Sequence, residues 1–183
     1  MIGSWSSSAD RSVEFWSPSN SEEGTCQLND YPREMDRGPT ANLVSGQLVA
    51  CYYNSCEFYD NGEWSNSTKT RSSRSQHSSA VDEKKRRILL IGGESSSSTE
   101  WISVVGSPSQ PGPFNVRHGN AHCTIKLSSD SILLTGGAGT EEEVTIYNIT
   151  TGDENRLNGM RQGRAQHACG VYQDAAGRQV GRL

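Results

Sequence analysis

The sequence predicts an all-β protein built from a repeat of about 45 residues. His77, His122 and His167 follow one another at a strict interval of 45 residues. Two apolar runs, residues 88–91 and 132–135, each end in a pair of glycines, and these pairs lie 44 residues apart. A period in this range is typical of repeat architectures, so the fold is predicted from the repeated unit.

Each period contains the signals of four short antiparallel strands. The unit opens at Arg-x-x-His and continues into small and apolar residues, followed by a polar turn at 82–86 or 128–130. The apolar run of four residues comes next, and its length favours a strand buried on both faces over a helix. After a loop, residues 144–149 alternate in polarity, and a turn at 150–152 leads into the last strand. Short strands with turn signals every ten or so residues predict all-β structure.

The same pattern continues towards the N-terminus in a weaker form. Residues 48–53 occupy the place of the apolar run, but Tyr52 and Tyr53 stand where the glycine pair is expected. The period therefore divides the whole chain, 1–183, into approximate repeats at 1–36 (partial), 37–73, 74–116, 117–163 and 164–183 (partial).

These motifs resemble the kelch repeat, in which an apolar strand ends in two glycines, a spaced Tyr and Trp follow, and Arg-x-x-His opens the next unit. The matching residues are Gly92, Gly93, Gly136, Gly137, Tyr59, Trp64, Tyr147, Arg74, His77, Arg164 and His167. His122 keeps the repeat phase but has no arginine three residues before it. The resemblance implies four-stranded blades arranged around a central axis, that is, a β-propeller.

The number of units predicts an incomplete ring of about three and a half blades. Propellers have about four to eight blades, and closure of the ring removes their edge strands. We therefore interpret the chain as a segment of a larger propeller, with closure of four blades as the less favoured alternative. Open edge strands can pair with other chains, so self-association is a further expectation.

The charge and the hydropathy pattern argue against a nucleic-acid partner and against a membrane span. The net charge is −4 and the isoelectric point is about 5.6, whereas nucleic-acid-binding surfaces are basic. No stretch approaches the eighteen or so apolar residues expected of a membrane span. No nucleic-acid partner and no membrane span are therefore expected in this chain.

Cysteines and glycosylation sequons bear on the compartment. Cys123 and Cys169 lie just after the repeat histidines, on the expected first strands of neighbouring blades, whereas Cys26, Cys51 and Cys56 cluster upstream. Any two of the upstream three could form a disulfide, and an odd total leaves one cysteine over. Asn66 and Asn148 each begin an Asn-x-Ser/Thr sequon. These features favour an extracellular or secretory protein slightly over a cytosolic one, since buried cysteines also serve as small core residues.

Three local patterns suggest chemistry that the repeat explains more simply. His118, His122 and Cys123 are spaced like metal ligands, but on a strand residues four apart lie about 13 Å from each other, too far for one zinc ion. The basic run 84–87 falls in a turn between two strands, which predicts a solvated hairpin tip. The acidic run 141–143 lacks the surrounding oxygen ligands of a calcium loop, so a solvated loop is expected there too.

The predicted function is a non-catalytic protein-interaction scaffold that binds protein partners through its inter-strand loops and needs no cofactor. The alternative is a fragment of a propeller enzyme similar to a galactose oxidase-type copper radical oxidase, with its active site outside this chain. Two partner settings remain open: an intracellular adaptor with a BTB-like dimerisation domain upstream, and a secreted or cell-surface adhesion protein.

Overall fold

The computed structural model describes residues 13–16, 25–32, 40–173 and 179–182, and it is all-β. The side chains of 13–16, 25–27, 66, 171–173 and 179–182 lie outside the description. The strands are β1 (Val13–Trp16), β2 (Thr25–Leu28), β3 (Thr40–Val44), β4 (Gln47–Asp60), β5 (Glu63–Arg74), β6 (Ser78–Asp82), β7 (Arg87–Ile91), β8 (Ser98–Ser103), β9 (Gln110–Asn115), β10 (Cys123–Lys126), β11 (Ser131–Thr135), β12 (Val144–Asn148), β13 (Glu154–Arg156), β14 (Gly170–Gln173) and β15 (Gln179–Arg182). One short 3₁₀ turn, η1 (Glu83–Lys85), joins β6 to β7.

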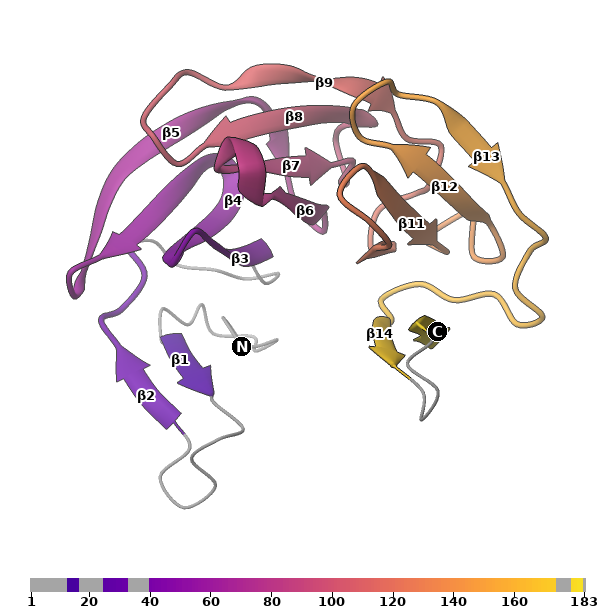
Figure 1. Cartoon of the computed structure of the whole chain (residues 1–183), viewed down its shortest axis with the longest axis horizontal. Coiled ribbons are helices and arrows are strands. Elements are labelled where there is room, and N and C mark those ends of the chain that lie inside the picture. The colour runs from indigo at the N-terminus through magenta and orange to yellow at the C-terminus, as the bar shows by residue number, and fades with distance from the viewer. Residues whose placement is uncertain (1–12, 17–24, 33–39, 174–178, 183) are drawn as a thin grey trace.

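The strands form separate antiparallel sheets that follow one another in an open arc (Figure 1). We call β3–β5 the first blade, β6–β9 the second and β10–β13 the third. The second and third are four-stranded meanders in simple sequence order. Two two-stranded sheets, β1–β2 and β14–β15, lie at the two ends of the arc. The all-β, propeller-like prediction is confirmed, and the sheets do not close into a ring.

The first blade differs from the expected four separate strands, because its two middle strands are joined as one bent strand. The Cα atoms of Cys51 and Cys56 are only 4.0 Å apart. Five residues of straight strand would cover about 16 Å, so β4 must double back between them. Its first arm pairs with β3 and its second arm with β5. The turn occurs where the other blades have their glycine pair, and Tyr53 there has a φ of 50°.

Strand β7, one of the two central strands of the second blade, shows how the blades are held together. Every residue from Ile88 to Ile91 is buried. Leu89 and Ile91 pack with Ile132, Leu134 and Tyr147 of the third blade. Ile88 and Leu90 point the other way and pack with Val49 and Phe58 of the first blade. Because strand side chains alternate between faces, one apolar run supplies both inter-blade cores, and this confirms the expected strand buried on both faces.

The outer strand of the second blade has an edge that avoids further pairing. In β9, Pro111 and Pro113 lack the N–H groups that another strand would need.

Tyr59 and Trp64 lie opposite each other in the first blade, with ring centroids 5.1 Å apart. Among the residues that the structure describes, no helix is long and apolar enough to cross a membrane.

Candidate functional site

A collar of backbone hydrogen bonds joins successive blades at the residue before each repeat histidine. Gln166 donates its N–H to the carbonyl of Ala121, and Ala121 donates to the carbonyl of Gln76, both at 2.9 Å. All three residues have positive φ, between 52° and 58°. They are spaced 45 residues apart, so this contact is part of the repeat. We call Gln76, Ala121 and Gln166, together with the histidines that follow them, the collar.

His122 and His167 each pack on the first glycine of the preceding blade's pair. A Cβ atom placed on Gly92 would lie 3.0 Å from Cε1 of His122, and one on Gly136 would lie 2.9 Å from Cε1 of His167. The rings also bond to hydroxyls of the preceding blade: His122 Nε2 to Ser78 Oγ at 2.8 Å and His167 Nε2 to Thr135 Oγ1 at 2.9 Å. The histidine and the glycine are thus two halves of one inter-blade contact.

Hydrogen bonding and burial keep His122 neutral. Its Nδ1 lies 2.8 Å from the carbonyl oxygen of Gly119, so Nδ1 carries the proton and Nε2 accepts from the hydroxyl of Ser78. Burial lowers the pKa of His122 to about 4, even though the bond to Gly119 opposes the shift. Burial also lowers the pKa of His118 and of His167.

This neutral histidine predicts acid sensitivity. Its pKa is about 4 in the folded chain and about 6.5 unfolded, so the stability that it contributes is present above pH 6.5 and is lost as pH falls towards 4. Between pH 7 and pH 5 we expect its titration to reduce the free energy of unfolding by about 2 kcal/mol. Urea unfolding at both pH values measures this loss of unfolding free energy, and the loss should be smaller in His122→Gln than in wild type. An equal loss in the variant would contradict the assignment.

His77 is the exception in the collar. Both its ring nitrogens are shut off from solvent without a hydrogen-bond partner, although the residue as a whole is partly exposed. Burial, with the positive charge of Arg74 second, lowers its pKa to about 3. In the preceding blade, the position of the first glycine is held by Tyr52, so the glycine surface on which the other two rings lie is absent there.

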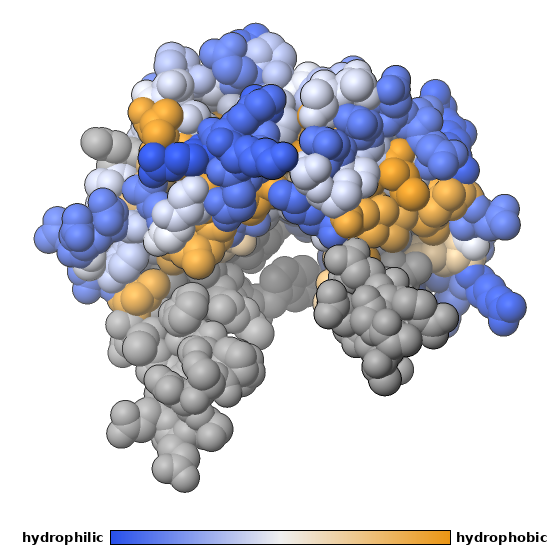
Figure 2. Space-filling model, viewed as in Figure 1, coloured by the Kyte–Doolittle hydropathy of each residue, from blue (hydrophilic) through white to orange (hydrophobic). Residues whose placement is uncertain are grey.

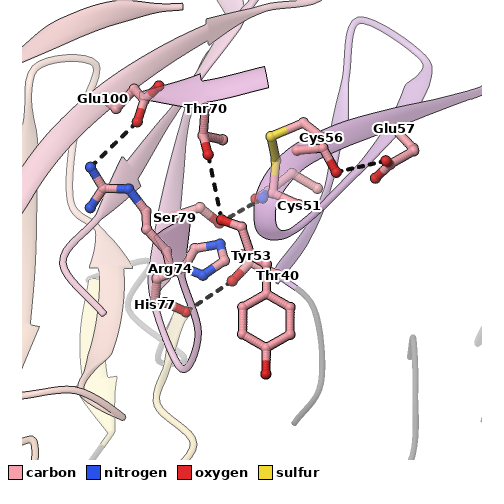
Figure 3. The surroundings of a disulfide bond; sticks show 12 residues. Thr40, Cys51, Tyr53, Cys56, Glu57, Thr70, Arg74, His77, Ser79 and Glu100 are labelled. Atoms are coloured by element: carbon pink, nitrogen blue, oxygen red, sulfur yellow. Dashed lines mark hydrogen bonds and ion pairs between the residues drawn. A yellow bond between two sulfur atoms is a disulfide. The ribbon is translucent and has the colours of Figure 1, made fainter. Parts of the chain in front are cut away.

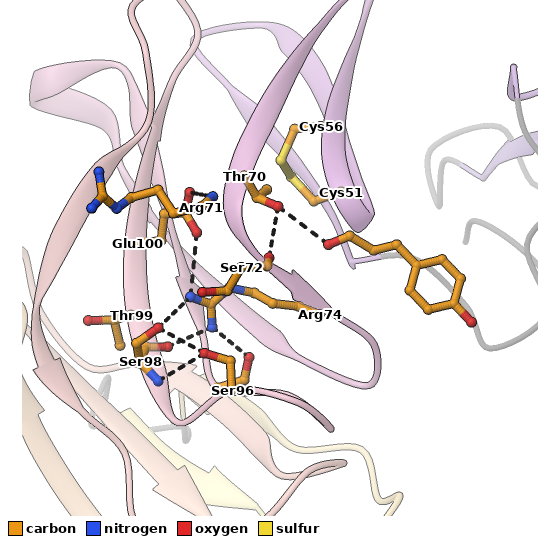
Figure 4. Close-up of polar contacts among 12 residues, drawn as sticks. Cys51, Cys56, Thr70, Arg71, Ser72, Arg74, Ser96, Ser98, Thr99 and Glu100 are labelled. Carbon is orange, nitrogen blue, oxygen red and sulfur yellow. Dashed lines mark hydrogen bonds and ion pairs between the residues drawn. A yellow bond between two sulfur atoms is a disulfide. The ribbon is translucent and has the colours of Figure 1, made fainter.

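Arg74 anchors the entry to the second blade and is 1% exposed. Its guanidinium donates to the carbonyl oxygens of Gly92 at 2.9 Å and Ser98 at 2.6 Å, and to the Ser98 hydroxyl at 2.8 Å. It also forms a buried ion pair with Glu100 at 3.4 Å. Burial lowers the pKa of Arg74, and the carboxylate of Glu100 opposes that shift. Figure 4 shows Ser98 and Glu100 beside the guanidinium of Arg74.

In the third blade, which lacks the arginine, His118 takes over this role. Its Nδ1 donates to the carbonyl of Gly136 at 2.8 Å, as Arg74 does to Gly92. Its Nε2 bonds to Thr145 Oγ1 at 3.0 Å, and Thr145 holds the same place opposite Leu134 that Glu100 holds opposite Leu90. A buried charged pair in one blade is therefore replaced by a neutral pair in the next. The missing arginine is compensated by a residue one position earlier in the sequence.

Two disulfides are present, which accounts for four of the five cysteines. Cys51–Cys56 joins the two arms of bent β4 (Figure 3). Cys123–Cys169 joins the start of β10 to the residue before β14, 46 residues later, and so links neighbouring sheets. The side chain of Cys26 lies outside the description, as does that of Asn66.

The remaining predicted residues have less uniform surroundings. Tyr147 is buried and stacks on Phe114, with ring centroids 4.5 Å apart. Arg164 is exposed, and its backbone bonds to the preceding blade: its N–H donates to the carbonyl of Glu141 at 2.8 Å, and its carbonyl accepts from the N–H of Gly137 at 3.0 Å. Asn148 accepts from the backbone N–H groups of Thr150 and Thr151, which places this sequon in a turn at the end of β12.

The suggested metal grouping has a different geometry from the one expected on a strand. His118 and His122 precede β10, and their ring centroids are 6.1 Å apart rather than far separated. Both ring nitrogens of each are occupied by the bonds described above. Among the described residues, no group of three His, Cys, Asp or Glu side chains could hold a metal ion.

Outside the collar, the described residues line hollows between and beside the blades. A groove of about 600 Å³ lies between the first and second blades, and a pocket of about 200 Å³ lies beside β12 and β13. The groove is lined by Gln47, Phe58, Ser65, Ser67, Thr68, Val104, Val105 and Gly106, and the pocket by Glu142, Glu143, Val144, Thr145, Arg156, Leu157 and Gly159. Val105 and Leu157 are 60% and 44% exposed.

The fold and the collar together define a class: an all-β protein of propeller-like, stacked antiparallel sheets. Solved structures share this architecture, and one of them is YjhT, with a TM-score of 0.69 over 93% of this chain and 72% of that chain. The two sequences are 9% identical, so the likeness concerns the fold alone. In all, 138 chains of solved structures match, so the fold does not select a function. No protein-family model and no curated protein matches the sequence.

Proposed function

We propose that this chain is a non-catalytic protein-interaction scaffold of the kelch-repeat type. The observation that carries the proposal is that the repeat markers serve contacts between blades. His122 and His167 pack on glycines, and Arg74 is enclosed by backbone carbonyls and Glu100. The repeated residues thus hold the blades, and the variable turns and hollows are left to bind partners.

The copper-oxidase alternative finds less support in the residues present. Such chemistry needs free histidine nitrogens and a cysteine available for linkage to tyrosine. His118 and His122 use both ring nitrogens in hydrogen bonds, and Cys51 is bonded to Cys56. His118, His122 and Cys51 are therefore not available to such a site, and the alternative keeps its active site outside this chain.

The disulfides favour a secreted or cell-surface setting over an intracellular adaptor. Disulfides persist in oxidising compartments and are rare in the cytosol. Within that setting, Asn66 and Asn148 are the proposed glycosylation sites. Self-association through unpaired strands remains part of the proposal, and β13, whose three residues are all exposed, is the candidate edge in the third blade.

The scaffold proposal is tested with the oxidised chain immobilised and exposed to the secreted proteins of its source. Each captured protein is purified and titrated against wild type, Val105→Glu and Leu157→Glu, which alter the two hollows. Thr151→Ala, in an exposed turn outside both hollows, is the control. We expect one-to-one binding that one of the two charged variants weakens about tenfold or more, and that the control leaves unchanged. Absence of saturable binding, or copper-dependent oxygen consumption by the chain, would contradict the proposal.

A further inference from the structure

The turn between β6 and β7 presents three consecutive cations to solvent. Asp82 caps η1 by accepting from the backbone N–H of Lys85, and Arg86 ends it with a left-handed φ of 49°. Lys84, Lys85 and Arg86 are all exposed. Figure 2 shows strongly hydrophilic side chains gathered where Figure 1 places η1. The local fold thus holds three positive charges on one tight turn.

A fourth cation reaches the same place from the next blade. Lys126, at the end of β10, donates its Nζ to the backbone carbonyl of Val81, directly before the capping Asp82. The side chain of Lys126 is exposed, like those on η1. We call Lys84, Lys85, Arg86 and Lys126 the basic strip, which crosses from the second blade to the third.

The carboxylates beside the strip are engaged elsewhere. Asp82 forms an ion pair with Arg87 at 3.1 Å, and Arg87 itself lies over the ring of Trp101. Glu83 accepts from the backbone N–H and the hydroxyl of Ser45, on the first blade. In the part of the chain that the structure describes, no carboxylate forms an ion pair with a residue of the strip. A concentrated positive charge therefore stands on a chain whose net charge is −4.

We propose that the basic strip binds a linear sulfated polysaccharide. Closely spaced lysine and arginine side chains on an exposed turn favour a polymer with regularly spaced anionic groups, because each contact releases bound counterions. The two disulfides favour an oxidising compartment, and in that setting sulfated glycans rather than nucleic acids are the available polyanions. This inference does not depend on a protein partner.

The test measures binding of a fluorescent heparin octasaccharide to the full oxidised chain in 0.15 M salt. The triple variant Lys84→Gln/Lys85→Gln/Lys126→Gln removes three charges of the strip. The matched triple variant Lys69→Gln/Arg161→Gln/Arg164→Gln removes three exposed charges elsewhere. We expect the strip variant to bind about tenfold more weakly or worse, the matched variant to change less than twofold, and affinity to fall steeply with added salt.

Two further probes separate sulfate recognition from general polyanion binding. A desulfated heparin octasaccharide should bind at least tenfold more weakly than the sulfated form, and a single-stranded DNA of equal charge should bind more weakly as well. Unchanged heparin binding by the strip variant, or no heparin binding by wild type, overturns the proposal. Equal or tighter binding of DNA or of the desulfated probe also overturns it. Circular dichroism of both variants verifies that the exposed substitutions leave the fold intact.

Discussion

Replacing Gly136 by alanine is expected to reduce the free energy of unfolding by about 4 kcal/mol. Gly136 has a φ of 62°, a conformation that costs an L-residue about 1–2 kcal/mol. The new Cβ would also lie 2.1 Å from the carbonyl oxygen of Arg164 and 2.9 Å from His167 Cε1. Relief of that overlap requires the next sheet to move away, which would break the collar contact. The total loss of unfolding free energy is therefore among the largest that single substitutions cause.

Gly46→Ala separates the two causes. Gly46 also has a positive φ, 82°, but nothing lies within 4 Å of the position of its Cβ. The free energy of unfolding of Gly46→Ala should therefore fall only by the cost of the left-handed backbone conformation, about 1 kcal/mol. Urea unfolding followed by circular dichroism compares both variants with wild type. Similar losses in the two would show that strain alone matters and that the histidine-on-glycine contact does not hold neighbouring blades together.

Arg74→Met is expected to cost about 3–5 kcal/mol, because it leaves the carboxylate of Glu100 buried without its partner. Both side chains are 1% exposed, so water cannot replace the lost charge. The variant also removes the donors to the carbonyls of Gly92 and Ser98. The loss is again measured by urea unfolding at pH 7.

Two comparisons make the Arg74 prediction specific. Arg74→Met/Glu100→Leu removes both charges and should recover at least half of the loss, as buried pairs replaced by apolar residues often do. Arg156→Met disrupts an exposed pair with Glu154, 3.8 Å long, and should cost less than about 1 kcal/mol. A double variant no more stable than Arg74→Met would contradict the view that an unpaired buried charge causes the loss.

Much of the fold could be predicted because strands and their turns leave local signals. The run from Ile88 to Ile91 packs one face against each neighbouring blade. A strand that is buried on both faces has a continuous apolar sequence, so this strand could be recognised from the sequence. The first blade was harder, because the turn in β4 has tyrosines and a disulfide in place of glycines. Nothing local distinguishes Cys51–Cys56 from other pairings with Cys26.

The site was less predictable, because its contacts join residues distant in sequence. His118 looked like a metal ligand, and its role as a neutral replacement for arginine depends on Gly136 and Thr145, 18 and 27 residues away. The positive φ of Gln76, Ala121 and Gln166 left no trace in residue type, since none is glycine. Their 45-residue spacing, one position before each histidine, was the signal that could have identified them.

The measurement that tests the central claim most directly is a tryptic peptide map of the native protein, prepared without reductant. Stacked neighbouring sheets place Cys123 beside Cys169, although 46 residues separate them. Cleavage after Arg117, Lys126, Arg164 and Arg178 should therefore release peptides 118–126 and 165–178 joined by a disulfide, with Cys51 linked to Cys56 inside one peptide. Cys123 found free, or linked to Cys26, Cys51 or Cys56, would contradict the stacking of successive units.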